Sequence, residues 1–254
     1  MSTPLTLNPK GGYRFLQGIE PYSSGVVAQP GHEIVHVTLS KSMNWHDGLV
    51  AARQHLEQSG LDHHALCAVE LRCPEPHSIG GFVEFNQQYR ALLEEWNIPV
   101  DGENPIARTN VAPVEDSPNE TVLYGFSYCK PSHTTRPTFV VAGGGELPHR
   151  SIDRDRIVRA GETSAAAMLA KAECVVGIMR HRLERLGATD DLISAIDVYT
   201  AHALQQPLAE VVMPALPAAS RLGVHWFYSR PPVREIEFEM DMRGVRQELV
   251  IDLA

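Results

Sequence analysis

Two hydrophobic patterns alternate along this chain. Apolar residues recur every three or four positions over residues 45–56, 82–96 and 168–186, and this spacing predicts amphipathic helices. The first helix is expected to end at Gly60, because glycine readily takes the left-handed conformation that closes a helix. Shorter runs of β-branched and alternating apolar residues predict strands. The expected strands cover residues 22–29, 33–39, 65–73, 107–114, 121–129, 138–142, 192–199, 223–229, 233–240 and 247–253.

A fourth apolar stripe, over residues 204–212, predicts a shorter helix because Pro207 and Pro214 interrupt it. Residues 129–137 carry prolines and polar side chains and are expected to form a linker. Strands therefore alternate with helices and close in antiparallel strands. This order predicts an α+β fold, in which both helices of a unit cover one face of a mixed sheet.

The second half of the chain repeats the pattern of the first half. Residues 55–60 (HLEQSG) align with residues 182–187 (RLERLG), and residues 66–71 align with residues 193–198, both at an offset of 127 residues, which is half of 254. A fixed register carried across helix-like and strand-like segments indicates an internal repeat. We therefore expect two units, residues 1–130 and residues 131–254.

The composition of the chain argues against two classes of binding partner, nucleic acids and membranes. The net charge is −9, with 43% hydrophobic and 21% charged residues, as in an ordinary globular protein. Nucleic-acid binding is not expected, because it needs an excess of Lys and Arg over one face. No apolar run approaches the roughly 18 residues that span a bilayer, and the N-terminal residues lack a secretory signal pattern. We expect a cytoplasmic protein without nucleic-acid or membrane partners.

The local features that could hold an ion are weak. His63 and His64 follow Gly60 in a polar turn, which does not favour a metal site. The glycine run at residues 143–145 follows a strand, as a phosphate-binding loop does, but lacks the spacing of such a loop. We interpret it as a tight turn or a close approach of the backbone. We therefore predict no metal.

Several short motifs occur in an order that resembles a known family. Residues 21–23 (PYS) open a predicted strand, residues 82–89 (FVEFNQQY) lie on the second helix, and residues 105–108 (PIAR) open another strand. This order resembles the RidA/YjgF family of imine and enamine deaminases. The second half continues the resemblance, which covers most of the chain, at residues 183–187, 232–234 and 248–254.

The resemblance implies a fold and an assembly. It implies two tandem RidA-like, chorismate-mutase-like units, each a mixed sheet with two helices on one face. In such proteins the units form a trimeric barrel with sites in the clefts between neighbouring units, so the resemblance implies a homotrimer. It also implies that the protein uses neither an organic cofactor nor a metal.

The resemblance also assigns residues. It implies that Arg108, and less closely Arg234, binds the substrate carboxylate, that Tyr22 lines the same cleft, and that Glu248 holds the attacking water. Two departures stand out, because the first unit has Thr121 where the second has Glu248, and the two arginines are 126 rather than 127 residues apart. Either one unit keeps a working pocket, or a pocket is assembled from both.

The residue types suit the hydrolysis of a C=N bond. An arginine fork fixes a carboxylate through two charge-assisted hydrogen bonds, and a carboxylate such as Glu248 can deprotonate water and return a proton to ammonia. The arginine-rich tail, with Arg230 and Arg234, is interpreted either as binding a second carboxylate or as solvated ion pairs with neighbouring acids. Trp226 could stack on a planar conjugated substrate or form a half-buried sheet edge.

The leading functional prediction is a cofactor-independent hydrolytic deaminase. Its substrate is expected to be a small unsaturated amino acid or dicarboxylate, such as the 2-aminomuconate of aromatic catabolism, and it would release ammonia. Two alternatives remain: chorismatase-like or ring-opening hydrolysis of a small carboxylate, and binding of a small molecule without turnover. Ring-opening amidases rely on Ser-Lys pairs, and lysine occurs only at positions 10, 41, 130 and 171. Ammonia release separates the leading prediction from the others.

Overall fold

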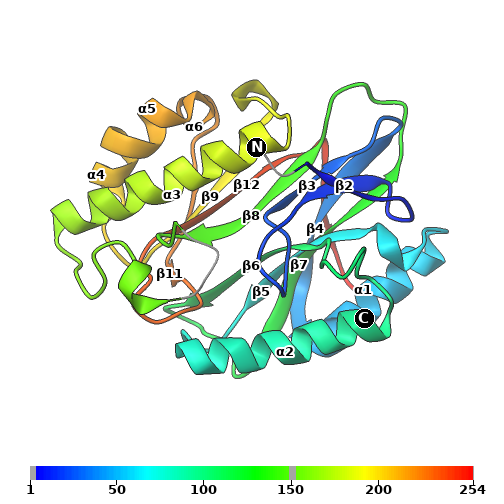
Figure 1. The fold of residues 1–254 in the computed structure, drawn as a ribbon, viewed down its shortest axis with the longest axis horizontal. Coiled ribbons are helices and arrows are strands. Elements are labelled where there is room, and N and C mark those ends of the chain that lie inside the picture. Colours follow the sequence, from blue (N-terminus) through cyan, green and yellow to red (C-terminus); the bar gives the residue numbers. More distant parts are fainter. Residues whose placement is uncertain (1–3, 149–152, 254) are drawn as a thin grey trace.

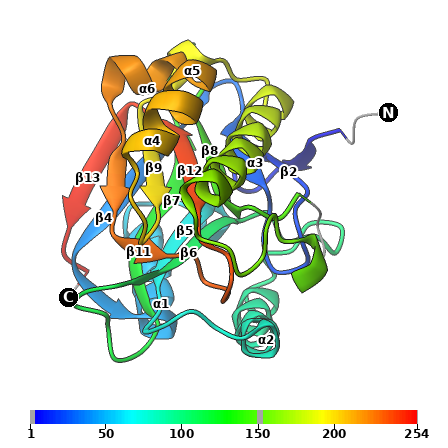
Figure 2. The same ribbon diagram turned by 90° about the vertical axis from the view of Figure 1, so that its left-hand side faces the viewer.

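Two β-sheets lie face to face in the computed structural model, which describes residues 4–148 and 153–253, and helices cover the outer face of each sheet (Figure 1, Figure 2). The seven-stranded sheet has the spatial order β1 (Thr6–Asn8), β2 (Tyr13–Leu16), β3 (Gly25–Ala28), β8 (Phe139–Gly145), β12 (Glu239–Gly244), β9 (Ala195–Tyr199) and β10 (His225–Phe227). The six-stranded sheet has the order β11 (Ser229–Arg230), β6 (Ala107–Pro113), β5 (Leu66–Arg72), β7 (Val122–Pro131), β4 (His32–Asn44) and β13 (Gln247–Ile251).

Each sheet carries its own helices. The six-stranded sheet is covered by α1 (Trp45–Gln58) and α2 (Ile79–Glu95), and the seven-stranded sheet by α3 (Ala165–Arg185), α4 (Gln205–Pro207), α5 (Met213–Ala215) and α6 (Pro217–Leu222). The long helices begin at the side-chain caps Asn44, Ser78 and Ser164, which accept backbone N–H groups of the first turn. Among the described residues, no helix combines the length and apolar composition needed to cross a membrane.

Three apolar clusters hold these layers together. One lies between the seven-stranded sheet and its helices and includes Phe238, and a second lies between the six-stranded sheet and its helices and includes Phe126. The third lies between the two sheets, where Phe15 and Val26 pack with Ile34. The inner face of each sheet is therefore covered by the other sheet, so a charged side chain on that face is buried.

The two halves of the chain arrange four of their strands in the same spatial order. The segment from β4 to β7 gives the spatial order β6-β5-β7-β4, and the segment from β8 to β12 gives β10-β9-β12-β8. In both, one pair of strands is parallel, β5 with β6 and β9 with β10, and the other pairs are antiparallel. The internal repeat of the sequence and the division of the chain at residues 130 and 131 stay predictions.

The predicted fold class is wrong. The chain does not form two tandem RidA-like units, because each sheet takes strands from both ends of the chain. Strand β3, from the start, pairs with β8, while β13, from the end, pairs with β4. Strand β11 likewise crosses to pair with β6. Local patterns locate strands but do not show which strands pair, so the sequence did not reveal that β3, β11 and β13 pair with strands of the other half of the chain.

The predicted helices and strands match the observed ones with few exceptions. The strand expected at residues 233–240 is wrong, since residues 231–238 are mostly irregular and β12 begins at Glu239. Strands β1 and β2 were not predicted. The helix expected at residues 204–212 is divided as its prolines indicate, with a π-helical turn at Leu208–Val212 between α4 and α5.

Candidate active site

A cavity of about 620 Å³ is lined by strands of both sheets, by helix α3 and by the segments that follow β2 and β11. Both halves of the chain line it, so of the two arrangements left open by the sequence the structure has a pocket assembled from both. Its lining includes Arg108 and Asn110 of β6, the glycines of β8, Glu239 of β12, and Arg182 and Arg185 of α3.

Arg108 is a buried cation of the cavity. It is 3% exposed, and its Cζ lies 4.5 Å from the ring centre of Tyr22 and 4.6 Å from that of Tyr89. Its Nη2 donates to Oδ1 of Asn86 at 2.6 Å, whereas Nη1 has no partner within residues 4–148 and 153–253. Burial lowers the pKa of Arg108, but a guanidinium stays charged at neutral pH. It therefore offers an immobilised positive charge with an unused N–H group to an anionic ligand.

Asn110 lies two residues further along β6, so its side chain is on the same face of the strand as that of Arg108. It is 3% exposed. Neither Oδ1 nor Nδ2 makes a hydrogen bond to the described part of the chain. Such unpaired buried atoms are rare in folded proteins, and each calls for an explanation.

Glu239 is the acid of the cavity. It is 5% exposed, and burial raises its pKa to about 8, with the charge of Arg182 opposing and that of Glu146 adding to the rise. Gly143 makes room for it, because a Cβ atom at that position would lie 2.3 Å from Oε1 of Glu239. Gly143 thus serves a close approach, one of the two roles that the sequence left open, and the glycine run lies in strand β8 rather than in a tight turn. A carboxyl group with this pKa is mostly protonated at pH 7 and can both donate and accept a proton.

Sequence reasoning missed Glu239. Residues 238–243 alternate between apolar and charged side chains, and Glu239 was counted among the acids that could form solvated ion pairs with the arginine-rich tail. The signal was present in that alternation. Only the second sheet, which covers the charged face, turns these residues into buried ones.

Basic residues of α3 line the cavity beside Glu239. Arg182 donates from Nη1 to the carbonyl oxygens of Ala142 and Gly143, at 2.8 and 3.1 Å. Arg185 lies three residues further along the same helix and also lines the cavity. These two arginines supply the second positive region that the sequence reasoning sought in the C-terminal tail.

The structure brings only two of the predicted site residues together. Arg108 and half-buried Tyr22 meet in the cavity. Burial raises the pKa of the Tyr22 phenol, against the opposing charge of Arg108, so it is neutral at pH 7. Arg234 is elsewhere, with 62% of its side chain exposed, and it contacts Glu75 and the carbonyl of Pro76.

The remaining predicted residues lie outside the lining of the cavity. Glu248, on the exposed strand β13, accepts a hydrogen bond from Nε of Arg243 at 2.9 Å. Exposed Arg230 lies on β11. Trp226 is 44% exposed on β10, the edge strand of its sheet, and donates to the carbonyl of Thr200 at 3.0 Å.

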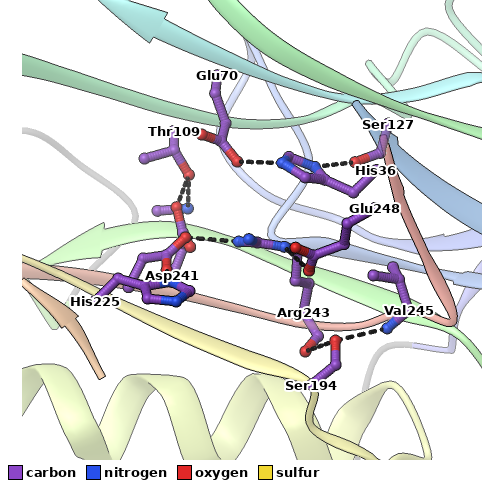
Figure 3. Close-up of polar contacts among 12 residues, drawn as sticks. His36, Glu70, Thr109, Ser127, Ser194, His225, Asp241, Arg243, Val245 and Glu248 are labelled. Atoms are coloured by element: carbon purple, nitrogen blue, oxygen red, sulfur yellow. Dashed lines mark hydrogen bonds and ion pairs between the residues drawn. The ribbon is translucent and has the colours of Figure 1, made fainter. Parts of the chain in front are cut away.

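A second polar cluster lies between the sheets, and we call it the central network (Figure 3). Asp197 accepts from Nη1 of Arg243 at 2.6 Å and contacts His225 at 2.7 Å. Oδ2 of Asp241 accepts from the Thr109 hydroxyl at 2.6 Å. The central network consists of His36, Glu70, Thr109, Asp197, Tyr199, His225, Asp241 and Arg243.

The pKa values of two buried acids of the central network are shifted in opposite directions. Burial alone would raise the pKa of Asp197, but hydrogen bonds from His225 and Arg243 bring it below the ordinary value. Burial, together with the charges of Asp197 and Glu70, raises the pKa of Asp241 well above its usual range. Asp197 is therefore the anion that Arg243 neutralises, and Asp241 is the acid of the two that holds its proton to higher pH.

Two groups of side chains place three possible metal-ligand atoms within 4.8 Å of one another: Asp62, His63 and His64, and three acids of the central network. In the first group, Nδ1 and Nε2 of His64 contact Asp62 and the Asn97 carbonyl, and Nε2 of His63 contacts the Trp96 carbonyl. In the second, Arg243, His225, Thr109 and Tyr199 already pair with the acids. Neither group has the open donor set that a metal needs.

Residues 32–36, HEIVH, match the zinc-binding pattern H-E-x-x-H, which the prediction of no metal left out. The pattern binds zinc on a helix, where residues four apart share one face. Here it lies in strand β4, where four residues span about 13 Å. His32 and His36 therefore cannot share one ion.

Comparison with known proteins gives the chain its relatives. A family model described as 2-aminomuconate deaminase CnbZ matches residues 5–249. A 2-amino-5-chloromuconate deaminase from Comamonas testosteroni is 38% identical over 247 residues, which cover 95% of this chain and 96% of that protein.

Two solved structures are distant likenesses. A chorismatase gives a TM-score of 0.47 at 11% identity and covers 96% of this chain and 89% of its own. A cyanuric acid hydrolase gives a TM-score of 0.41 at 12% identity, and the match covers 85% of this chain and 68% of the hydrolase chain. Likenesses this distant say nothing about the reaction.

Proposed function

Since this chain belongs to the 2-aminomuconate deaminase CnbZ family, we propose that the cavity around Arg108 and Glu239 is its active site. The chain is a deaminase of aminomuconate-like substrates and acts on a C–N bond. The predicted deaminase activity on aminomuconate-like substrates is thereby confirmed. The observation that supports this location is the unpaired Nη1 of Arg108, a buried cation held ready for a carboxylate.

The proposed reaction consumes one water and releases one ammonia. The substrate is an enamine, and transfer of a proton from nitrogen to the carbon chain converts it to an imine. Protonated Glu239 donates to the imine nitrogen, and the resulting carboxylate accepts a proton from water as the water oxygen bonds to the C=N carbon. Glu239 then returns this proton to nitrogen, the C–N bond breaks, and the hydroxyl proton passes back to Glu239 as the carbonyl forms.

The substrate is held at both ends in this proposal. Arg108 binds the carboxylate next to the amino group, with Tyr22 stacked on the guanidinium. Arg185, supported by Arg182, binds the distant carboxylate, because a second charge-assisted contact fixes the length of the ligand as well as its position. An acidic protein gains from such a local cluster of arginines, which attracts a dianion.

The remaining expectations are kept as proposals. We propose that the reaction needs no cofactor, since Glu239 can move each proton and the arginines can hold the charge. A homotrimer of cytoplasmic chains, with a mass of about three times 28.0 kDa, also stays a prediction that light scattering tests. The wider relationship to the RidA/YjgF superfamily likewise stays a prediction.

The function is tested by incubating the purified protein with 2-aminomuconate and following both ammonia and the absorbance of the conjugated chromophore. We expect one ammonia for each chromophore lost. Treatment with a chelator, followed by gel filtration, should leave the rate unchanged. Loss of the chromophore without ammonia would contradict a deaminase, and loss of activity on chelation would contradict a cofactor-independent one.

A further inference from the structure

Asn110 differs from other buried asparagines of this protein. Asn8 donates to the His64 carbonyl and accepts from the backbone of Gly11. Asn104 donates to the Pro21 carbonyl and accepts from the backbone of Ile106. Asn110 is equally buried, yet its donor and its acceptor both lack a partner in the described part of the chain, and it lines the cavity.

An unpaired buried amide opposes folding, because its groups have given up water without gaining a protein partner. Packing does not require it, since an apolar side chain of similar volume would avoid that cost. The residue therefore makes physical sense if a ligand supplies both partners. That ligand must offer an acceptor and a donor side by side.

We propose that Asn110 recognises the amino group that lies next to the substrate carboxylate. This inference rests on the proposed function. Arg108 and Asn110 are two residues apart on one face of β6, about 6.6 Å along the strand. With a carboxylate on Nη1 of Arg108, the adjoining C–N unit extends along the strand toward Asn110.

The amide matches a 2-amino unsaturated acid in both polarity and order. Nδ2 donates to a carboxylate oxygen, and Oδ1 accepts an N–H of the amino group on the neighbouring carbon. A simple unsaturated diacid such as muconate offers only the carboxylate oxygen. The 2-oxo product has no N–H, so its carbonyl oxygen faces Oδ1 without a hydrogen bond, which favours release.

The test compares Asn110→Leu and Asn110→Ala with Asn8→Ala, a matched loss of a buried amide away from the cavity. For each variant we measure kcat/KM for 2-aminomuconate, the Kd of muconate as a diacid without an amino group, and Tm. We expect both Asn110 variants to lose about 10- to 100-fold in kcat/KM, and to weaken muconate binding by a factor about tenfold smaller, because muconate uses only the Nδ2 contact and 2-aminomuconate uses both. The Tm of Asn110→Leu should not fall, whereas Asn8→Ala should lower Tm and leave kcat/KM unchanged.

Equal losses for 2-aminomuconate and muconate, or a lower Tm for Asn110→Leu with no selective loss, would overturn the inference and make Asn110 a structural residue. These results are distinct from a failure of the proposed function. That function fails if the wild-type protein releases no ammonia, or if Arg108→Ala keeps the wild-type kcat/KM. Activity that depends on Arg108 but not on Asn110 would remove the inference alone.

Discussion

The cavity and the central network are both built from buried carboxylates and arginines, but within residues 4–148 and 153–253 only the cavity, of these two regions, leaves buried side-chain atoms without a hydrogen-bond partner. In the central network, Asp197 and Arg243 neutralise each other, and the space beside them is about 10 Å³. In the cavity of about 620 Å³, Arg108 and Asn110 have atoms without a partner. Unused hydrogen-bonding capacity, rather than density of charge, therefore distinguishes the proposed site from a structural cluster.

The largest expected effect comes from the anchor of the cavity. Arg108→Ala should lower kcat/KM for 2-aminomuconate about 10³-fold, because the buried cation and its charge-assisted hydrogen bond to the carboxylate are lost. Steady-state kinetics measure this loss. Arg234→Ala serves as the control, since its exposed guanidinium contacts Glu75 and Pro76 outside the lining of the cavity. Similar losses in both variants would contradict the location of the site.

Glu239→Gln should lower kcat about 10²- to 10³-fold, because the amide cannot exchange a proton. In the wild-type protein, activity that depends on the protonated acid should fall as pH rises through about 8. A pH profile of kcat measures both effects. A profile that is flat between pH 7 and pH 9 would exclude Glu239 as the acid.

The raised pKa of Glu239 also predicts how the stability of the protein changes with pH. Its folded-state pKa is raised, so the folded protein holds a proton that the unfolded chain releases above the ordinary pKa of 4.5. Stability should therefore fall as pH rises from about 4.5 to 8 through this group. Thermal melts should show a smaller fall for Glu239→Gln, and identical slopes in the two proteins would count against the burial of this carboxyl group.

Arg243→Met should lower the stability of the protein and leave its activity unchanged, the opposite of what we expect for variants of the cavity. Removing one partner leaves Asp197 buried with only His225, which costs about 3–5 kcal/mol of stability. The kcat of the protein that remains folded should be close to the wild-type value. Denaturant unfolding and kinetics at low temperature separate the two quantities, and a stable but inactive variant would place the central network in the reaction.

Arg185→Ala should have a smaller and more selective effect. We expect KM for 2-aminomuconate to rise about tenfold, because one hydrogen-bonded charge pair at a partly exposed position is lost. A monocarboxylic substrate of the 2-aminoacrylate type should be unaffected, since it has no distant carboxylate. An equal change for both substrates would show that Arg185 does not read the second carboxylate.

Glu248→Gln should have the smallest effect. Its carboxylate is 46% exposed and pairs with Arg243 from the edge strand β13, so stability should change by less than about 1 kcal/mol. The value of kcat/KM should stay within about twofold of wild type. A loss comparable to that of Glu239→Gln would return Glu248 to the role that its sequence position suggested.

The sequence predicted the features that depend on neighbouring residues and missed those that depend on contacts between distant segments. Helical periodicity located α1, α2 and α3, because that signal is local, and the resemblance carried by residues 105–108 pointed to Arg108, which lines the cavity. Partnering of the strands is not local, so the exchange of β3 and β13 between the sheets was missed. Glu239 was missed for the same reason, since its burial depends on a second sheet built from other parts of the chain.

The central claim is that the unpaired Nη1 of Arg108 receives the substrate carboxylate. The most direct test is a crystal structure of the protein with muconate bound. One carboxylate should lie within hydrogen-bond distance of Arg108 Nη1 and Asn110 Nδ2, with the conjugated chain extending past Glu239 toward α3. Muconate bound with both carboxylates away from Arg108, at the C-terminal arginines or on the outer surface, would contradict the account.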